Sequence, residues 1–191
     1  MMKKKLLYTI IIYAFISSCK QDYTPKPRGF MKIEYPAKIY THFENHAPFM
    51  FDYPEYAKIV PDTSPNTEKF WYNLEFRPFN GTLYLSYKNV DENLDQYIED
   101  SRTLAYKHTI KAEAIEESRI SIPQRSVYGL LYDLSGNTAS SLQFYVTDSA
   151  RHFLRGSLYF NSTPNKDSLA PVVAFIREDV LHMIETMEWN N

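Results

Sequence analysis

Two histidines and a glutamate alternate in the run His42-Phe43-Glu44-Asn45-His46. Alternate side chains of a β-strand point to the same face, so His42, Glu44 and His46 could in principle converge on one metal ion. Neighbours on that face are about 7 Å apart along the strand, however, and rarely bind one ion without a further ligand. The alternative is that all three are solvated residues of an edge strand or a loop. We therefore expect no metal and no other cofactor, and keep these three residues as the candidate ligands.

A second group of polar side chains lies on a predicted helix and includes Ser101, Arg102, Lys107 and His108. Ser101 and His108 share a helix face, but seven residues of helix separate them by about 10 Å along the axis. That distance disfavours a direct hydrogen bond between a serine nucleophile and a histidine base. The chain also lacks a Gly-x-Ser-x-Gly turn. We expect no enzyme activity and no catalytic residue, whereas Arg102 and Lys107, on the exposed face, are candidate contacts for a partner protein.

The N-terminus has the composition of a signal peptide. Three consecutive lysines at positions 3–5 precede the apolar run 6–16. About eleven apolar residues rise only about 16 Å as a helix, which is too short for a hydrocarbon core of about 30 Å. A charged start followed by a short apolar stretch is typical of a secretory signal. We predict a signal peptide at residues 1–18 and export from the cytoplasm.

The only cysteine of the chain follows this segment directly. The residues Ile16-Ser17-Ser18-Cys19 resemble the lipobox of bacterial lipoproteins, in which an aliphatic and two small residues precede a cysteine. The resemblance implies cleavage before Cys19, a diacylglycerol thioether on its sulfur and a fatty acyl chain such as palmitate on its new amine. Two or three such chains would anchor the protein stably to a membrane. The alternative is an ordinary secreted protein, cut near Ser18, in which Cys19 is incidental.

The residues after Cys19 predict a tether. Residues 19–28 contain two prolines, which favour an extended polyproline-like conformation of about 3.1 Å per residue. Such a segment would hold a folded domain at most about 28 Å from the lipid surface. It is either a plain spacer or a docking segment, for which Tyr23, Lys26 and Arg28 are the candidate contacts.

Composition limits the remaining residues, 29–191, to a single globular domain. Hydrophobic residues make up 44% of the chain and aromatic residues 16%, which is enough to fill a core. The net charge of −2 falls to −5 when the signal peptide removes three lysines, so no basic surface for nucleic acid is expected. The five scattered glycines form neither a dinucleotide-binding motif nor a P-loop. A lipidated Cys19 would leave no thiol for a disulfide, so the core alone must stabilise the fold.

Strand patterns dominate the domain. The runs 30–36 and 49–54 both end in Tyr-Pro, which predicts edge strands because proline cannot donate a hydrogen bond to a sheet. Residues 58–67 are predicted as a loop. Apolar residues then alternate on both sides of Asn80-Gly81, which predicts a hairpin over residues 70–87. Four further strands are predicted at about 117–122, 126–133, 139–147 and 152–160, the last three as an antiparallel meander.

Two helices complete the prediction. Apolar residues at four-three spacing predict a helix that begins with Asp91 as its cap and ends at about Ala112. A second apolar stripe predicts a closing helix to about Glu188, capped by Asp167 or Ser168. Strands, helix, strands and helix in this order predict an α+β fold with a mainly antiparallel sheet and two main helices.

Two segments resemble the gliding motility lipoproteins of the GldD family of Bacteroidetes. One is Asp22-Tyr23-Thr24-Pro25-Lys26-Pro27-Arg28-Gly29, directly after the lipobox cysteine, and the other spans residues 97–109 of the predicted helix. Length and element order fit the family over the whole mature chain. The resemblance implies a component of the gliding apparatus, which shares machinery with the type IX secretion system. It carries over no functional residue except Cys19.

These features predict a cell-envelope lipoprotein that supports assembly or stability of the gliding and type IX secretion machinery through protein contacts. Only Asp22 is acidic directly after Cys19, so the acid-rich surface-export signal of this phylum is weak and the domain is expected to face the periplasm. The alternative is a lipid-tethered domain that binds a small ligand or a glycan. The element order is also similar to the Mog1/PsbP-like sandwich, a likeness of fold that implies no function.

Overall fold

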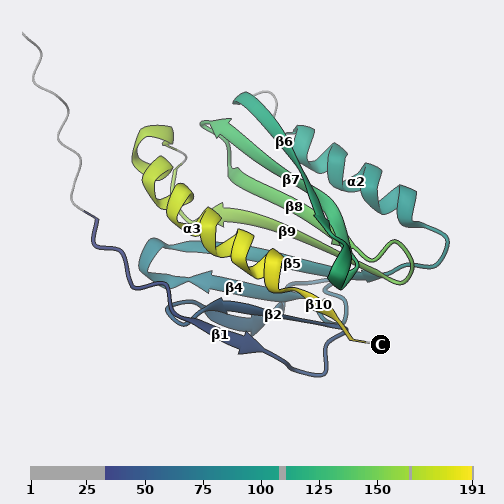
Figure 1. The fold of residues 1–191 in the computed structure, drawn as a ribbon. Helices are drawn as coiled ribbons and strands as arrows, with labels where there is room; N and C mark the ends of the chain where they lie inside the picture. The colour runs from purple at the N-terminus through teal and green to yellow at the C-terminus, as the bar shows by residue number, and fades with distance from the viewer. Residues whose placement is uncertain (1–32, 108–110, 164, 191) are drawn as a thin grey trace, which may run out of the picture. The chain divides into compact units, whose positions relative to one another are not determined.

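The computed structural model describes residues 33–107, 111–163 and 165–190. In the unit Glu34–Asn191, one helix, α2 (Leu94–Tyr106), covers one face of a seven-stranded antiparallel sheet, and the other, α3 (Lys166–Thr186), covers the opposite face (Figure 1). A three-stranded sheet lies beside α3. The signal peptide, Cys19 and the tether predicted from the sequence lie outside the described residues.

The strands follow one another in antiparallel pairs. In chain order they are β1 (Tyr40–Phe43), β2 (Phe49–Pro54), β3 (Lys58–Pro61), β4 (Tyr72–Phe76), β5 (Gly81–Asn89), β6 (Ala112–Ile122), β7 (Val127–Gly136), β8 (Ser140–Thr147), β9 (His152–Phe160) and β10 (Glu188–Trp189). The small sheet has the order β1-β2-β10, and the large sheet has the order β3-β4-β5-β9-β8-β7-β6. The fold is therefore α+β with a mainly antiparallel sheet and two main helices, which confirms the predicted class.

The predicted hairpin is formed by β4 and β5. Phe76 pairs with Gly81, and the short 3-10 turn η1 (Arg77–Phe79) together with Asn80 joins the two strands. Asn80 has a φ of 52°, in the left-handed region that asparagine tolerates better than most residues. The predicted meander is also confirmed, because β7, β8 and β9 pair in sequence.

The edge predictions near the start of the domain are wrong. Residues 33–36 form no strand, and the rest of the predicted strand 30–36 lies outside the described residues. β2, which spans 49–54, lies in the middle of its sheet because the distant β10 pairs with its other side. The predicted loop 58–67 contains β3, whose Pro61 is tolerated because β3 is itself the outer strand of the large sheet.

Both helices begin and end at residues other than those predicted. The first begins at Leu94, because the side chain of Asn93 accepts a hydrogen bond from the backbone of Asp91 and holds that residue in a turn. It ends at Tyr106, and Ala112 already belongs to β6. In the second helix, Asn165 rather than Asp167 or Ser168 is the cap, since its side chain accepts from the backbone N–H of Ser168 at 3.2 Å.

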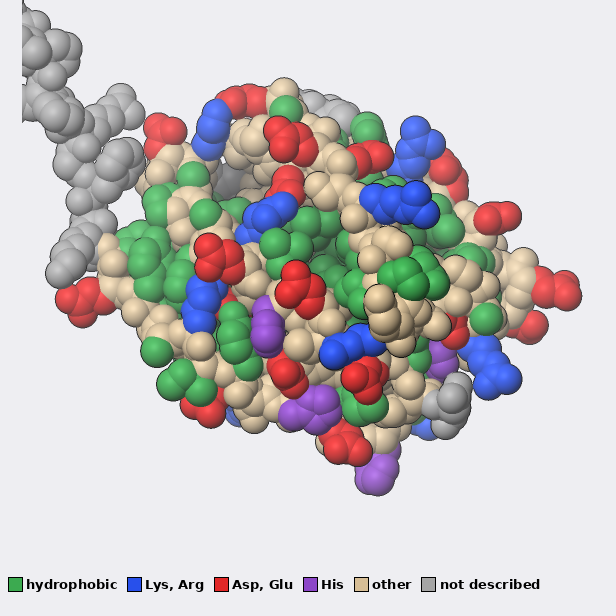
Figure 2. All heavy atoms as spheres, in the orientation of Figure 1, with side chains coloured by type: hydrophobic (Ala, Val, Ile, Leu, Met, Phe, Trp, Pro, Cys, Tyr) green, Lys and Arg blue, Asp and Glu red, His purple; other side chains and the backbone are tan. Residues whose placement is uncertain are grey.

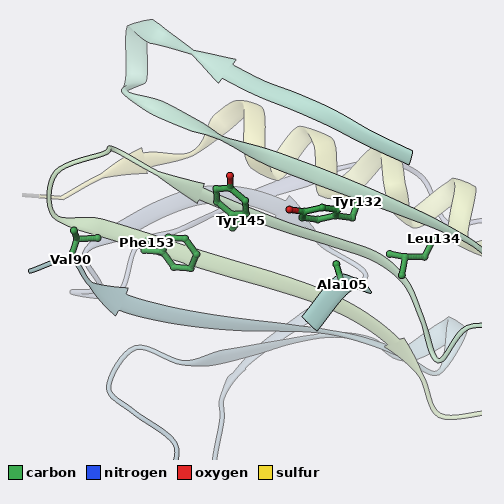
Figure 3. Close-up of a cluster of buried hydrophobic side chains, with 6 residues drawn as sticks. All are labelled: Val90, Ala105, Tyr132, Leu134, Tyr145 and Phe153. Atoms are coloured by element: carbon green, nitrogen blue, oxygen red, sulfur yellow. The ribbon is translucent and has the colours of Figure 1, made fainter. Parts of the chain in front are cut away.

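Each face of the large sheet has its own core. On the α2 side, six buried residues form one cluster, with Tyr145 stacked on Phe153 at 5.5 Å between ring centroids (Figure 3). Burial raises the pKa of Tyr132 in this cluster to about 12. On the α3 side, the predicted apolar stripe is confirmed, because Ile176, Val180, Met183 and Ile184 are buried and the helix packs against β2. Fully buried residues there are Phe49, Phe51, Leu83, Leu158, Ile176 and Met183.

Candidate interaction surfaces

A buried carboxylate fixes the first described segment to α3. Asp179, on α3, is only 1% exposed. Lys38 Nζ and the hydroxyl of Tyr40 donate to its Oδ1 at 2.9 and 2.8 Å, and the hydroxyl of Tyr56 donates to its Oδ2. Burial and then the hydrogen bond to Asp179 raise the pKa of both tyrosines, so both stay protonated donors. The carboxylate of Asp179 thus joins two parts of the chain to α3. One is residues 35–40, which we call the entering segment, and the other is the turn between β2 and β3.

The same entering segment contacts α3 through Phe175. The ring of Tyr35 stacks on that of Phe175 with centroids 4.5 Å apart. The ammonium of Lys38 lies 4.0 Å from the Phe175 ring centroid, and it also donates to the backbone carbonyl of Phe175 at 2.8 Å. Residues 35–40, which follow the predicted tether in the sequence, are therefore held by charge, hydrogen bonds and ring packing together.

The three candidate metal ligands are not brought together. His42 lies on β1 and its Nδ1 is 2.7 Å from Oδ1 of Asp52 on β2, whereas Glu44 and His46 lie in the exposed turn that follows. His46 has a φ of 46°, so the chain leaves the extended conformation that would align alternate side chains. In the part of the chain that the structure describes, no three His, Cys, Asp or Glu residues are placed to hold a metal ion.

The candidate contacts on α2 lie on its outer face. Arg102 is exposed, with its guanidinium 3.8 Å from Glu99 and over the ring of Tyr106 at 5.7 Å. Lys107 is exposed at the end of the helix, next to Tyr106, which is 38% exposed. Ser101, by contrast, is buried at 3% exposure, on the face of α2 that lies against the large sheet. The tether candidates Tyr23, Lys26 and Arg28 lie outside the described residues.

A buried histidine lies where the two sheets meet. His152, at the start of β9, is 6% exposed, and its Nδ1 lies 2.8 Å from the hydroxyl of Tyr87. Its ring is stacked on Trp189 of β10, with centroids 5.1 Å apart. Nε2 is buried without a hydrogen-bond partner among the described residues. Burial lowers the pKa of His152 below its usual value of 6.5, because the charged imidazolium would lose its hydration in this site.

We expect His152 to make the domain acid-sensitive. The unfolded chain binds a proton at His152 near pH 6.5 while the folded chain does not, so stability should be constant above that pH and fall as the pH drops below it. The slope should reach about 1.4 kcal/mol per pH unit until the folded pKa is reached. Urea unfolding between pH 5 and pH 8, followed by Trp fluorescence, measures it.

His152→Phe, which keeps the ring packing, should remove this slope, whereas His42→Gln should keep it because His42 is half exposed. Asp148 is not expected to interfere. Burial alone would raise the pKa of Asp148, but backbone N–H donors of residues 150–152 outweigh it and hold the pKa below 3.8. An unchanged slope in His152→Phe would assign the acid sensitivity to another group.

A groove of about 420 Å³ lies between the first half of α3 and the region around the end of β7, and we call it the α3 groove. Its apolar lining residues are Leu134, Leu169, Ala170, Val173 and Ala174. Figure 2 shows this side of the molecule, with apolar surface between charged side chains of both signs. Thr138 also lines the groove, at 4% exposure, and its hydroxyl has no partner among the described residues.

Two acidic and two basic side chains line the α3 groove, and they differ in their ion pairs. Arg177 forms a bidentate ion pair with Asp133, with Nε–Oδ1 and Nη2–Oδ2 distances of 2.8 and 2.9 Å. Lys166 pairs with Glu113. Glu116, an exposed lining residue on β6, has no ion-pair partner among the described residues. The hydrogen bonds to Asp133, with Glu116 contributing less, raise the pKa of Arg177. Arg177 is thus engaged by Asp133, and Glu116 is the one charged lining residue without an ion pair among the described residues.

A wider and more open hollow, of about 810 Å³, lies over β4, β5 and β9. Tyr84 and Tyr159 meet edge to face there, with ring centroids 5.8 Å apart, and Tyr84 is 40% exposed. Glu75 and Arg77 line the same hollow and form an ion pair with each other. Tyr84 of the 70–87 hairpin thus reaches the surface on the face that α3 does not cover.

Sequence reasoning did not single out Asp179, Thr138 or Glu116. Asp179 had a signal, since it is an acid between Ile176 and Val180 on an otherwise apolar helix stripe, and buried acids require partners. Thr138 and Glu116 had no such signal in the sequence, because the groove forms only where the first half of α3 lies near the end of β7. Neither described helix combines the length with the apolar composition needed to cross a membrane.

Comparison with known proteins places the chain in a family. The sequence has no significant match among curated proteins. A solved structure that it matches is the solution structure of cyanobacterial PsbP (CyanoP) from Synechocystis sp. PCC 6803, with 12% sequence identity, a TM-score of 0.47, and coverage of 81% of this chain and 95% of that chain. A family model described as gliding motility lipoprotein GldD matches residues 20–189. Because that match spans almost the whole chain after the lipobox cysteine, the chain belongs to the GldD family of gliding motility lipoproteins.

Proposed function

We propose that the chain is a periplasm-facing envelope lipoprotein, lipidated at Cys19, that stabilises the gliding apparatus and the associated type IX secretion machinery through protein contacts. The observation that carries the proposal is membership of the GldD family over residues 20–189. The firm attachment of residues 35–40 to α3 supports it, because a pull on an N-terminal lipid would reach the body of the domain through that segment.

A non-enzymatic role is part of this proposal. Asp179, the most enclosed acid of the domain, is saturated by three hydrogen-bond donors, and Ser101 is buried against the sheet. Exposed aromatic, aliphatic and charged groups, such as Tyr84, Leu104 and Arg102, suit contact with other proteins. The proposed partners are other components of the machinery, in addition to the membrane through the lipid.

We expect Cys19→Ala to abolish anchoring and gliding. Without the thiol, no diacylglycerol thioether can form, so metabolic labelling with an alkyne fatty acid should be lost and spreading should match that of the deletion strain. Lys20→Ala leaves the lipobox intact and is the matched control. Quantitative mass spectrometry of envelope proteins should show other machinery components depleted in both defective strains. Normal spreading of the deletion strain, or labelling retained by Cys19→Ala, would contradict the proposal.

The second candidate function, a lipid-tethered domain that binds a small ligand or a glycan, is favoured by one specific observation. The α3 groove has a volume of about 420 Å³, within the range of about 300–1,000 Å³ typical of ligand sites. Native mass spectrometry of the lipoprotein extracted from cells tests this function. A stoichiometric bound molecule that Ala174→Trp removes would support it, and a protein of unliganded mass would argue against it.

A further inference from the structure

The α3 groove combines three features that are rarely found together on an inert surface. Its floor is apolar, it contains the buried and unpartnered hydroxyl of Thr138, and its rim carries Glu116, which has no ion pair among the described residues. A hydroxyl that is 4% exposed and has no hydrogen-bond partner among the described residues destabilises the free domain. An occupant that offers a donor or an acceptor to Thr138 would relieve this destabilisation.

The surroundings of the groove favour a protein segment over a compact ligand as its occupant. Glu116 lies on β6, which is the last strand of the large sheet and is 11 residues long. The groove therefore continues onto a sheet edge whose outer backbone groups have no neighbouring strand in the described structure. A peptide backbone offers one N–H and one C=O per residue, which suits both this edge and the hydroxyl of Thr138.

The charges that line the groove indicate which charge a bound segment should carry. Lys166 and Arg177 are each paired with a carboxylate of the domain, so neither demands an anion. Among the charged residues that line the groove, Glu116 alone has no ion-pair partner in the described structure, and the mature sequence is acidic as a whole. A complementary segment therefore carries a cation.

We propose that the α3 groove binds an extended segment of a partner protein, which places one branched apolar side chain over Val173 and Leu169 and a lysine or arginine beside Glu116. This inference rests on the protein-contact function proposed above and names the surface and the chemistry of the contact. Ala170 and Ala174, both exposed on α3, leave the space that the apolar side chain fills.

In-cell photocrosslinking of the full lipoprotein tests the surface. The crosslinking amino acid p-benzoylphenylalanine replaces Ala174 in the groove or, as the control, Ser168, which is exposed on the same helix but does not line the groove. We expect a protein adduct from position 174 and none from 168. Mass spectrometry of the adduct should map the crosslink to a segment in which an apolar residue lies within a few residues of a lysine or arginine.

Charge reversal tests the chemistry. Glu116→Lys should lower the yield of the adduct by about tenfold, the factor that corresponds to 1.4 kcal/mol. Glu117→Lys is the matched control, because Glu117 is the next residue of β6 and points to the α2 side, where it accepts a hydrogen bond from Tyr106. Reversal of the partner's cation to glutamate should restore the yield with Glu116→Lys. Both glutamates are exposed, and an unchanged melting temperature confirms folding.

The outcomes separate this inference from the proposed function. An adduct with a lipid, a small molecule or a second copy of the chain would overturn the inference, as would equal adduct yields for Glu116→Lys and Glu117→Lys. No adduct from position 174 in cells that glide normally would also overturn it, while the dependence of gliding on the lipoprotein would still stand. Normal gliding of the deletion strain would instead refute the proposed function itself.

Discussion

Replacement of Asp179 by alanine is expected to lower the free energy of unfolding by about 3–4 kcal/mol, a large part of the stability of a domain of this size. The substitution removes the acceptor for Lys38, Tyr40 and Tyr56 at once. The hydroxyls of two half-buried tyrosines and the ammonium of Lys38, whose side chain is 26% exposed, would then lack their main partner. The loss of a hydrogen-bond partner costs more than the net gain of forming the bond, because the remaining group stays desolvated.

The neighbouring Glu178 provides the matched control. Its carboxylate also approaches Lys38, at 3.2 Å, but its side chain is 67% exposed. Exposed ion pairs contribute about 0–1 kcal/mol, so Glu178→Ala should change the stability little. Urea unfolding of residues 20–191, monitored by circular dichroism, measures both variants. A loss below about 1 kcal/mol for Asp179→Ala would show that water replaces the carboxylate easily and that the cluster is not the anchor of this segment.

The Asp179 variant also tests how the entering segment is held. If the carboxylate fixes residues 35–40, hydrogen exchange in residues 34–43 should become faster in Asp179→Ala before the sheet itself opens. Amides of β8 and β9, in the centre of the large sheet, should keep their protection. The comparison separates local release of the segment from global loss of stability, and it tests whether Asp179 alone holds residues 35–40 on α3.

Local patterns in the sequence predict the elements whose partners are close in the chain. The hairpin over residues 70–87, the meander and the apolar stripe of α3 all depend on alternation or helical spacing within a few tens of residues. Cap positions are harder, because Asn165, Asp167 and Ser168 are all good cap residues and only the path of the chain selects Asn165. The sequence therefore predicts the helix correctly but misplaces its first residue.

Local sequence patterns do not predict the pairing of strands that lie far apart in the chain. β2 is predicted as an edge strand from Tyr53-Pro54, yet Glu188 and Trp189 pair with Met50 and Phe49 across most of the chain. The groove escapes for the same reason, since Glu116, Thr138 and Val173 come from three elements. The alternation of His42, Glu44 and His46 is misleading because the strand ends at Phe43. Alternating residue types predict a shared site only when the backbone stays extended over all of them, so that every second side chain points to the same face.

Gly129→Ala is expected to destabilise the domain by about 3 kcal/mol or more, through a collision that no side-chain movement can relieve. Gly129 lies on β7 between β6 and β8. A Cβ atom at this position would lie 1.9 Å from the backbone carbonyl oxygen of Tyr145 and 3.0 Å from the Cα of Val146. Relief requires β7 and β8 to separate, which breaks ladder hydrogen bonds in the large sheet.

Gly81→Ala is the matched control because it makes the same chemical change on another strand of the same sheet. Its Cβ would meet the ring of Phe160 at 3.0 Å, and a ring at the end of a strand can shift by a few tenths of an ångström. Alanine also restricts the unfolded chain, which stabilises the folded state by about 0.4–1 kcal/mol and offsets the contact. Urea midpoints should therefore differ clearly between the two variants, with Gly81→Ala close to the parent. Equal midpoints would mean that β7 and β8 can move apart at little cost. The close approach at Gly129 would then not fix the register of β7, the strand that pairs with the edge strand β6.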